Sequence, residues 1–300
     1  MSIKHGRYRL NNQQCTWAKN RLTGLILLII LSSIQISFNQ SYAAGQLMIA
    51  PTRVVFEGRD RSAQINVMNT GNATETYRIS FVEKRMSESG DFITIEKADA
   101  GERFASKMIR YSPRQVVLPP GKSQTIRLML RRPKNISEGE YRSHLYFQNI
   151  PKNSAKNVDQ LVNDNNKQVK IELTPIVGIT IPVIVRHGKT SANSALQDMK
   201  LIKPNNKDPR TKLVFQINRQ GNQSSYGDLT ATHIPNDGNE KIIGRANGVA
   251  VYLPNSHRKV QMLLNMAQGQ SLSKGKILMT YRERPEDGGA LLASTELLLP

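Results

Sequence analysis

Apolar and polar residues alternate over an unusual length in residues 167–186, KQVKIELTPIVGITIPVIVR. The apolar positions fall on odd numbers, at Val169, Ile171, Leu173, Val177, Ile179 and Ile181. The positions between them include Lys170, Glu172, Thr174 and Thr180. Because successive side chains of a β-strand point to opposite faces, this pattern predicts one long strand with one apolar face.

Two prolines, Pro175 and Pro182, fall inside this predicted strand. Proline cannot donate a hydrogen bond to a β-ladder, so its presence indicates a sheet edge or a bulge. The segment is also much longer than a typical strand of about 5–6 residues. A long apolar edge invites pairing with another chain. We therefore expect either that another part of the protein covers this strand or that pairing is its function.

The residues before this segment form short apolar runs separated by turn residues. Several runs alternate strictly, and turns such as Asn69-Thr70-Gly71-Asn72 lie between them. The runs cover residues 47–49, 54–56, 63–67, 77–81, 92–95, 116–118, 126–130 and 141–147. Short strands at this spacing, without a helical period, predict an all-β sandwich.

A second β-rich region follows the long segment. Residues 187–190, HGKT, have the composition of a linker between two domains. The next predicted strands cover residues 213–217, 229–231, 250–253, 260–264, 276–281 and 291–299. We predict a first domain over residues 44–186 and a second, smaller sandwich over residues 187–300.

The first 43 residues have the pattern of a secretory signal peptide. An apolar stretch at residues 22–31 follows a basic region without acids and precedes Ser41-Tyr42-Ala43, which fits a cleavage site. The basic residues are Lys4, Arg7, Arg9, Lys19 and Arg21. The apolar run is too short for the alternative, an uncleaved membrane anchor. The sequence therefore predicts export to the periplasm.

Composition limits the possible functions of the mature chain. Cys15 is the only cysteine and lies in the predicted signal, so thiol chemistry and disulfides are excluded from the rest. Without the signal, the formal net charge falls from +19 to +14. No basic helix or aromatic–basic motif supports nucleic-acid binding. Attraction to an anionic membrane is unspecific, so an acidic protein partner is favoured.

No pattern of enzymatic residues stands out. The histidines after the signal, His144, His187, His233 and His257, lack metal-ligand spacing, and His144 alternates with strand residues. Nucleophile-elbow, phosphate-loop and zinc-protease motifs are missing from the sequence. Glu57 and Asp60 are best explained as a charged turn. We therefore predict a protein that is not an enzyme, with no catalytic, cofactor-binding or metal-binding residues.

Four motifs, in order, resemble the periplasmic chaperones of the chaperone–usher pilus systems. Residues 51–58, PTRVVFEG, resemble the first-strand motif of that family. Residues 112–128, SPRQVVLPPGKSQTIRL, resemble its proline-glycine turn and the strand after it. Residues 141–151, YRSHLYFQNIP, are similar to its penultimate strand, and the alternating segment falls where the family has its donor strand.

The resemblance implies two immunoglobulin-like β-sandwich domains at an angle, with a cleft between them. It also implies a mechanism. A pilus subunit lacks its last strand, and the chaperone lends its own strand to the groove that this leaves. Val169, Ile171 and Leu173 are then the donor residues. Val177 lies on the same face, and we expect it to contribute more to the chaperone's own core.

The family anchors the terminal carboxylate of the subunit with an arginine and a lysine. Arg53 matches the arginine and can form two charge-assisted hydrogen bonds with a carboxylate. The lysine is expected near Thr180, where threonine carries no charge. The sequence therefore departs from the family at one half of the anchor, which is typical of a divergent branch.

The partners that the resemblance implies are pilus or fimbrial subunits and an outer-membrane usher. The sequence leaves open whether the unbound protein self-associates through its exposed strand. One alternative is a pilus subunit, which the lack of a mature cysteine and the retained long strand disfavour. A second is an exported two-sandwich enzyme or sugar-binding protein. That alternative is disfavoured because the only tryptophan, Trp17, lies in the signal.

Overall fold

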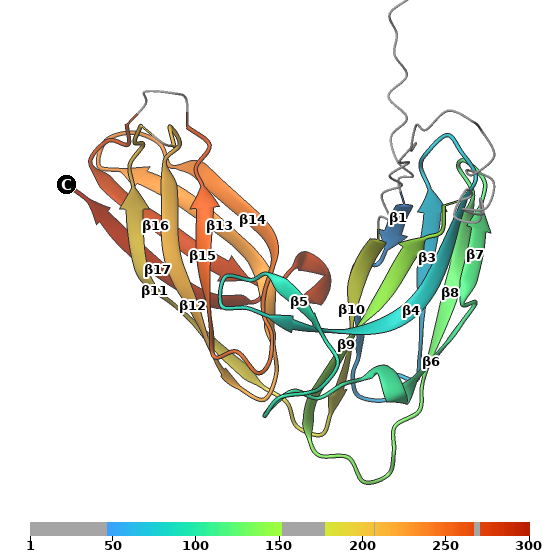
Figure 1. Cartoon of the computed structure of the whole chain (residues 1–300). Helices are drawn as coiled ribbons and strands as arrows, with labels where there is room; N and C mark the ends of the chain where they lie inside the picture. The colour runs from blue at the N-terminus through green and yellow to red at the C-terminus, as the bar shows by residue number, and fades with distance from the viewer. Residues whose placement is uncertain (1–46, 152–177, 207, 267–270) are drawn as a thin grey trace, which may run out of the picture. The chain divides into compact units, whose positions relative to one another are not determined.

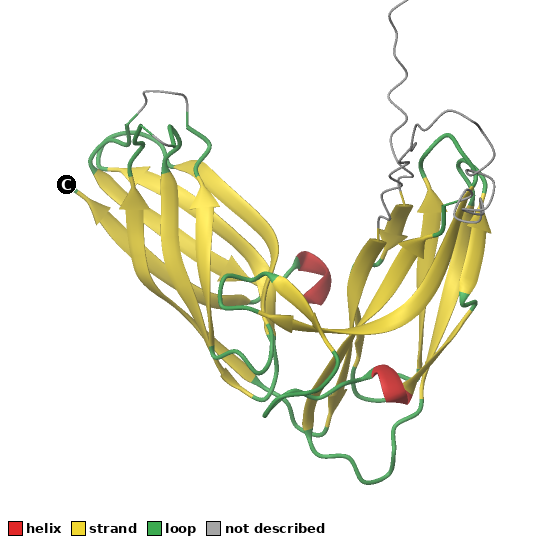
Figure 2. Cartoon of the chain, viewed as in Figure 1, coloured by secondary structure: helices red, strands yellow, loops and turns green. Residues whose placement is uncertain are grey.

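The computed structural model describes residues 47–151, 178–206, 208–266 and 271–300. These residues form four β-sheets, shown in Figures 1 and 2. Within the described ranges the helical elements are two 3-10 turns, Ser106–Met108 and Pro285–Asp287. No helix there has the length and apolar character needed to cross a membrane. The prediction of an all-β fold is confirmed.

Two sheets make the first sandwich. The first has the strand order β1 (Leu47–Ala50), β3 (Ser62–Asn69), β8 (Ser123–Leu130) and β6 (Ile109–Ser112). The second has the order β2 (Val54–Phe56), β10 (Gly178–His187), β9 (Gly139–Asn149), β4 (Glu75–Met86) and β5 (Phe92–Ile95). Strand β7 (Gln115–Leu118) also pairs with β4. All pairs are antiparallel except β2 with β10, which is parallel.

Alternation along the strands builds the core of this sandwich. On β8, Ile126 and Leu128 are fully buried and Leu130 is also buried, whereas Met129, between Leu128 and Leu130, is 54% exposed. The core joins such positions from both sheets, including Phe56, Ile65, Leu145 and Val183. Each large apolar side chain buried in this way contributes about 1.5–3 kcal/mol relative to an exposed one.

The second sandwich uses the same construction. One sheet has the order β11 (Ala192–Ile202), β12 (Lys212–Gly221) and β15 (His257–Leu263). The other has the order β14 (Lys241–Val251), β13 (Ser225–Pro235), β16 (Gly275–Arg282) and β17 (Leu291–Leu299). Its core contains the alternating residues of β12, Leu213, Phe215 and Ile217, and those of β13, Leu229 and Ala231.

Strands β6 and β11 escaped the sequence analysis, and of β14 it predicted only residues 250–251. Strand β11 carries a bulge between Gln197 and Lys200, where the pairing with β12 shifts register. Asp198 in this bulge has a φ of 55°, a conformation that asparagine and aspartate tolerate better than most residues. A bulge adds one residue to the strand and changes the face on which later side chains lie. The alternation that identifies a strand is therefore lost in β11.

The structure describes only the second part of the predicted long strand. Gly178–His187 form β10, while Val169, Ile171, Leu173 and Val177 lie outside the described residues. On β10, Ile181, Val183 and Val185 enter the core. Strand β2 pairs only with residues 183–185 of β10. Among the described strands, residues 178–182 therefore have a neighbour on one side only, and Pro182 lies at this edge as predicted.

His144 lies opposite Pro182 on β9 and is buried. Neither ring nitrogen has a hydrogen-bond partner in the described ranges, and the ring meets Phe92 edge-on at 5.2 Å between centroids. Burial, with added repulsion from Arg142 and Lys84, lowers the pKa of His144 to about 3. His144 is therefore a neutral packed side chain, in agreement with its placement on a strand.

This histidine predicts a pH dependence of stability. The unfolded chain binds a proton at His144 below about pH 6.5, but the folded chain does not until about pH 3. Stability from this group is therefore complete above pH 6.5 and is lost as the pH falls towards 3. Between pH 7 and pH 5 we expect a loss of about 2 kcal/mol in the free energy of unfolding.

Urea unfolding at several pH values measures this loss, and His144→Leu should reduce the slope over the same interval. The control is His187→Leu, at the end of β10. An unchanged slope in His144→Leu would contradict the assignment.

Candidate functional site

The short parallel pair of β2 and β10 places several charged side chains on one sheet face. Val54 and Phe56 of β2 point into the core, so Arg53, Val55 and Glu57 point to the opposite face. A cavity of about 440 Å³ lies against this face and is lined by Arg53, Glu57 and Arg186. The second sandwich lines its other side with residues that include Ser224, Tyr226, Glu283, Glu286 and Asp287.

Arg53 has unused hydrogen-bonding capacity in this cavity. Its guanidinium carbon lies 4.1 Å from the ring centroid of Tyr226. Its Nε and Nη2 are buried and have no hydrogen-bond partner among the described residues. These two nitrogens form one edge of the planar group, so their N–H bonds can reach the two oxygens of one carboxylate.

Arg85 shows the same edge of an arginine in use within this protein. Its Nε donates to Glu102 Oε1 at 2.7 Å, and its Nη2 donates to Glu102 Oε2 at 2.8 Å. The hydrogen bond from Arg85 lowers the pKa of the Glu102 carboxyl group. Arg53 has the same pair of donors as Arg85, but they have no acceptor among the described residues.

Thr180 lies on β10 opposite Tyr146 and is partly buried. Val54 pairs with Val183, so the position level with Arg53 on β10 is Pro182. Neither Thr180 nor Pro182 carries charge, and neither lines the cavity. The structure therefore brings Arg53 to the cavity but does not bring Thr180 there with it. A role for Thr180 in anchoring remains a prediction.

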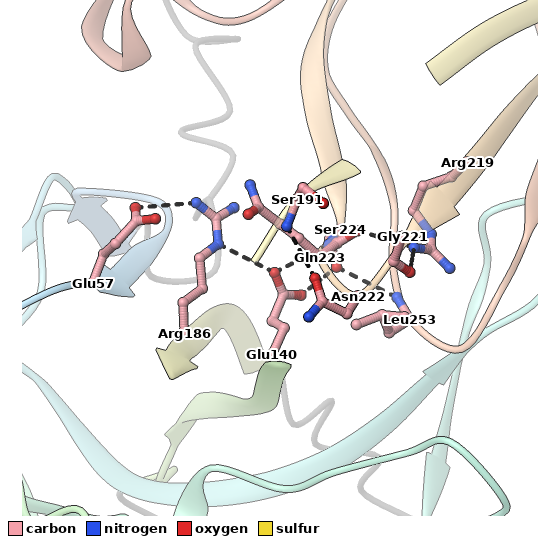
Figure 3. Close-up of polar contacts among 10 residues, drawn as sticks. All are labelled: Glu57, Glu140, Arg186, Ser191, Arg219, Gly221, Asn222, Gln223, Ser224 and Leu253. Atoms are coloured by element: carbon pink, nitrogen blue, oxygen red, sulfur yellow. Dashed lines mark hydrogen bonds and ion pairs between the residues drawn. The ribbon is translucent and has the colours of Figure 1, made fainter. Parts of the chain in front are cut away.

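Arg186 is the second cation of the cavity, and its partners are acidic residues of the same sandwich. It contacts Glu57 at 3.2 Å through Nη1 and Glu140 at 3.4 Å through Nε, as Figure 3 shows. The Glu140 side chain is only 1% exposed. Because two carboxylates already bind Arg186, it is less available than Arg53 to an incoming anion.

Glu140 also connects the two sandwiches. The backbone N–H of Ser224 donates to Glu140 Oε2 at 3.1 Å, and the Ser224 hydroxyl donates to Oε1 (Figure 3). Ser224 lies just before β13, where Arg219 of β12 donates to the carbonyls of Gly221 and Gln223 at 2.7 and 3.0 Å. The turn that contacts Glu140 is thus itself held by hydrogen bonds.

An apolar cluster lies beside this polar network. It consists of Met86, Ile184, Ala250 and Tyr252, with Val55 and Tyr226 packed against them. Arg142 covers the ring of Tyr252 at 4.2 Å and donates to the carbonyl of Lys84 at 3.1 Å. Burial lowers the pKa of Arg142 and raises that of Tyr252. Residues of both sandwiches therefore share one desolvated cluster next to the cavity.

The sequence analysis found Arg53 but missed Glu140, Ser224 and Tyr226. Glu140 could have been noticed, because it is an acid at the start of the alternating run 141–147. Glu57 and Asp60 form the predicted turn, with Asp60 N donating to Glu57 O at 3.0 Å. Glu57 additionally pairs with Arg186. Within the described ranges, no group of three or more histidine, cysteine or acidic residues could hold a metal ion.

A comparison with protein families matches the first sandwich to one family model. Residues 46–186 match the model of the pili and flagellar-assembly chaperone, PapD N-terminal domain. The resemblance predicted from the four motifs is thereby confirmed for this part of the chain. No curated protein sequence matches the chain.

Three solved structures illustrate the similarity. One is the CsuC–CsuE chaperone–tip adhesion subunit pre-assembly complex from archaic chaperone-usher Csu pili of Acinetobacter baumannii. It has 15% sequence identity to this chain, the match covers 84% of this chain and 97% of that chain, and the TM-score is 0.41. The YadV chaperone has 12% identity, coverage of 84% and 99%, and a TM-score of 0.41. The Pseudomonas aeruginosa CupB2 chaperone has 12% identity, coverage of 84% and 100%, and a TM-score of 0.40. Because these TM-scores are low, the resemblance to this family rests on the match of residues 46–186.

The burial of Glu140 predicts a large effect of its removal. In Glu140→Ala, Arg186 and Ser224 lose their buried partner, and breaking such a pair typically costs about 3–5 kcal/mol. We expect the free energy of unfolding, measured in urea, to fall by roughly this amount. Glu138→Ala, two residues away and exposed, is the matched control and should change stability by less than about 0.5 kcal/mol. If Glu140→Ala lowers the free energy of unfolding as little as Glu138→Ala does, the buried network does not contribute to stability.

Proposed function

We propose that this chain, whose first sandwich belongs to the pili and flagellar-assembly chaperones, is a periplasmic chaperone that binds pilus subunits and delivers them to an outer-membrane usher. The observation that carries this proposal is Arg53, which lines a cavity beside a sandwich that matches this family and whose Nε and Nη2 have no hydrogen-bond partner among the described residues. The proposed activity is binding without turnover.

Arg53 is the proposed anchor for the terminal carboxylate of a subunit. Hydrogen bonds between charged groups are roughly twice as strong as neutral ones, and two parallel bonds fix the orientation of the carboxylate. The site is partly desolvated, which strengthens the attraction between charges. A carboxylate there also gives acceptors to two buried N–H groups that have none within the described part of the chain.

The proposed anchor has one arginine rather than a matched arginine and lysine. Thr180 and Pro182 are neutral, and Arg186 is paired with Glu57 and Glu140. The role of Thr180 is limited to donating one hydrogen bond through its hydroxyl. The subunit must therefore gain more of its affinity from backbone pairing than from a second cation.

The donor strand is proposed to consist of Val169, Ile171 and Leu173, with Val177 at its end. These residues lie outside the described part of the chain, so the support comes from β10, which follows them directly. Residues 178–182 of β10 pair with β9 on one side and with no described strand on the other. An edge of this kind can accept a partner strand, and alternate side chains then fill pockets in the partner.

The same proposal covers export and domain organisation. Residues 1–43 act as a cleavable signal for the periplasm, residues 44–186 form the subunit-binding domain, and residues 187–300 form the second domain. The edge of β10 also offers a site for self-association of the unbound chaperone, since edge strands pair with each other.

Arg53→Ala tests the anchor. The chain is co-expressed with exported proteins encoded beside it, and complexes are isolated from periplasmic extract. We expect capture of a subunit to fall by about 10–100-fold, the equivalent of a charged hydrogen bond. The midpoint of thermal unfolding should change little, because the Nε and Nη2 edge makes no hydrogen bond with any residue that the structure describes.

Two controls accompany this substitution. Arg53→Lys keeps the charge without the two-pronged edge and should bind at an intermediate level. Arg110→Ala removes an exposed arginine from β6 and should bind as the wild type does. A large loss of stability in Arg53→Ala, with normal capture by the folded fraction, would make Arg53 structural.

A double substitution tests the donor strand. Replacing Ile171 and Leu173 with aspartate places charges on the face that enters the subunit groove, so capture should be lost while the chain stays folded. The matched control places aspartate at Lys170 and Thr174, on the alternate face, and should retain capture. Persistent co-purification of a subunit with the Ile171→Asp, Leu173→Asp variant would show that the donor residues are assigned wrongly.

A further inference from the structure

The guanidinium of Arg53 rests on a side chain of the second sandwich. The Tyr226 ring, on β13, lies 4.1 Å from the guanidinium carbon, well within the distance of about 6 Å for a cation–π interaction. Both residues line the same cavity. We propose that Tyr226 is a positioning residue that holds the guanidinium of Arg53 at the wall of this cavity, where it binds a carboxylate. This inference rests on the proposed function of Arg53.

Contact with an aromatic face suits an arginine that must bind a ligand. The interaction uses the face of the planar guanidinium, whereas the N–H bonds lie in its plane. Tyr226 can therefore restrain Arg53 without using any of its donors. An ion pair with an acid would restrain the side chain equally well but would occupy the edge, as Glu102 does for Arg85.

The ring of Tyr226 is itself fixed from its own sandwich. Arg284 Nη1 lies 3.4 Å from the Tyr226 hydroxyl oxygen and donates to it. Gly248 faces the ring with a φ of +65°, and a Cβ there would lie 3.1 Å from the hydroxyl oxygen. Tyr226 also packs on the apolar cluster that includes Val55 and Ile184. These contacts set the ring independently of Arg53.

Restraint of Arg53 before binding has a thermodynamic consequence. Immobilising a flexible side chain at an interface weakens binding, and a side chain that is already ordered avoids much of this cost. The carboxylate affinity of Arg53 therefore depends on Tyr226. A residue of the second sandwich thus controls an anchor that the sequence of the first sandwich supplies.

The test uses a small carboxylate, so it does not need the natural subunit. The mature chain, labelled with ¹⁵N, is titrated with N-acetylglycine, and the Arg53 Nε–H signal is identified by its absence in Arg53→Lys. N-acetylglycinamide, which lacks the charge, is the control ligand. We expect saturable shifts with the acid only. Tyr226→Phe should keep its affinity within about twofold, while Tyr226→Leu and Tyr226→Met should lose about tenfold.

The outcomes separate the two proposals. Unchanged affinity in folded Tyr226→Leu or Tyr226→Met overturns the role of Tyr226 and leaves the anchor intact. No response of Arg53 to N-acetylglycine in the wild type overturns the anchor and the role of Tyr226 with it. Capture of a co-expressed subunit gives a second readout, in which Tyr226→Leu should have no further effect once Arg53→Ala is present. An additional loss in the double variant would show that Tyr226 acts independently of Arg53.

Discussion

The short parallel pairing of β2 with β10 is the constraint on which the rest of the site depends. Only residues 183–185 of β10 take part. This pairing adds β2 to the sheet, puts Val54 and Phe56 into the core, and turns Arg53 and Glu57 towards the cavity. Because the pairing is so short, it leaves residues 178–182 of β10 without a neighbour on that side among the described strands. A longer β2 would cover the edge that the proposed function requires.

Three arginines of the first sandwich differ in their interactions because their surroundings differ. Arg85 is bound by Glu102 and Asp99 and is structurally satisfied. Arg142 is deeply buried against Tyr252, where loss of hydration lowers its pKa and one nitrogen donates to a carbonyl. Arg53 resembles Arg142 in stacking on a tyrosine, but its Nε and Nη2 have no acceptor among the described residues. Burial of donors without acceptors is costly, and the carboxylate proposed above would supply the acceptors.

The contacts between the sandwiches combine an apolar cluster with one buried carboxylate. The cluster around Ile184 and Tyr252 supplies non-directional stabilisation. Glu140 adds directional interactions, because its two carboxylate oxygens bind Ser224 and Arg186 at defined positions. Burial of a carboxylate is favourable only when its hydrogen bonds are satisfied. Glu140 therefore favours the arrangement in which Ser224 reaches it, and that arrangement also brings Tyr226 to Arg53.

The sequence by itself determined the all-β class, most strands, the resemblance of the first sandwich to a chaperone family and Arg53 as a candidate anchor. Alternation identifies the two faces of a strand because side chains there have a period of two residues. It failed for β11, where the bulge at Asp198 changes the face. It also could not tell whether His144 was on the surface or buried, because both positions occur on an alternating strand.

Only the tertiary structure decided what lies opposite each face. Glu140 meets Ser224 across 84 positions of the chain, and Arg53 meets Tyr226 of the other sandwich. A local pattern contains no information about such contacts, because they depend on how separate sheets pack. The parallel register of β2 on β10 likewise put Pro182, rather than Thr180, level with Arg53. Hydrogen-bond geometry across the sheet, which spacing along one strand cannot reveal, fixes that register.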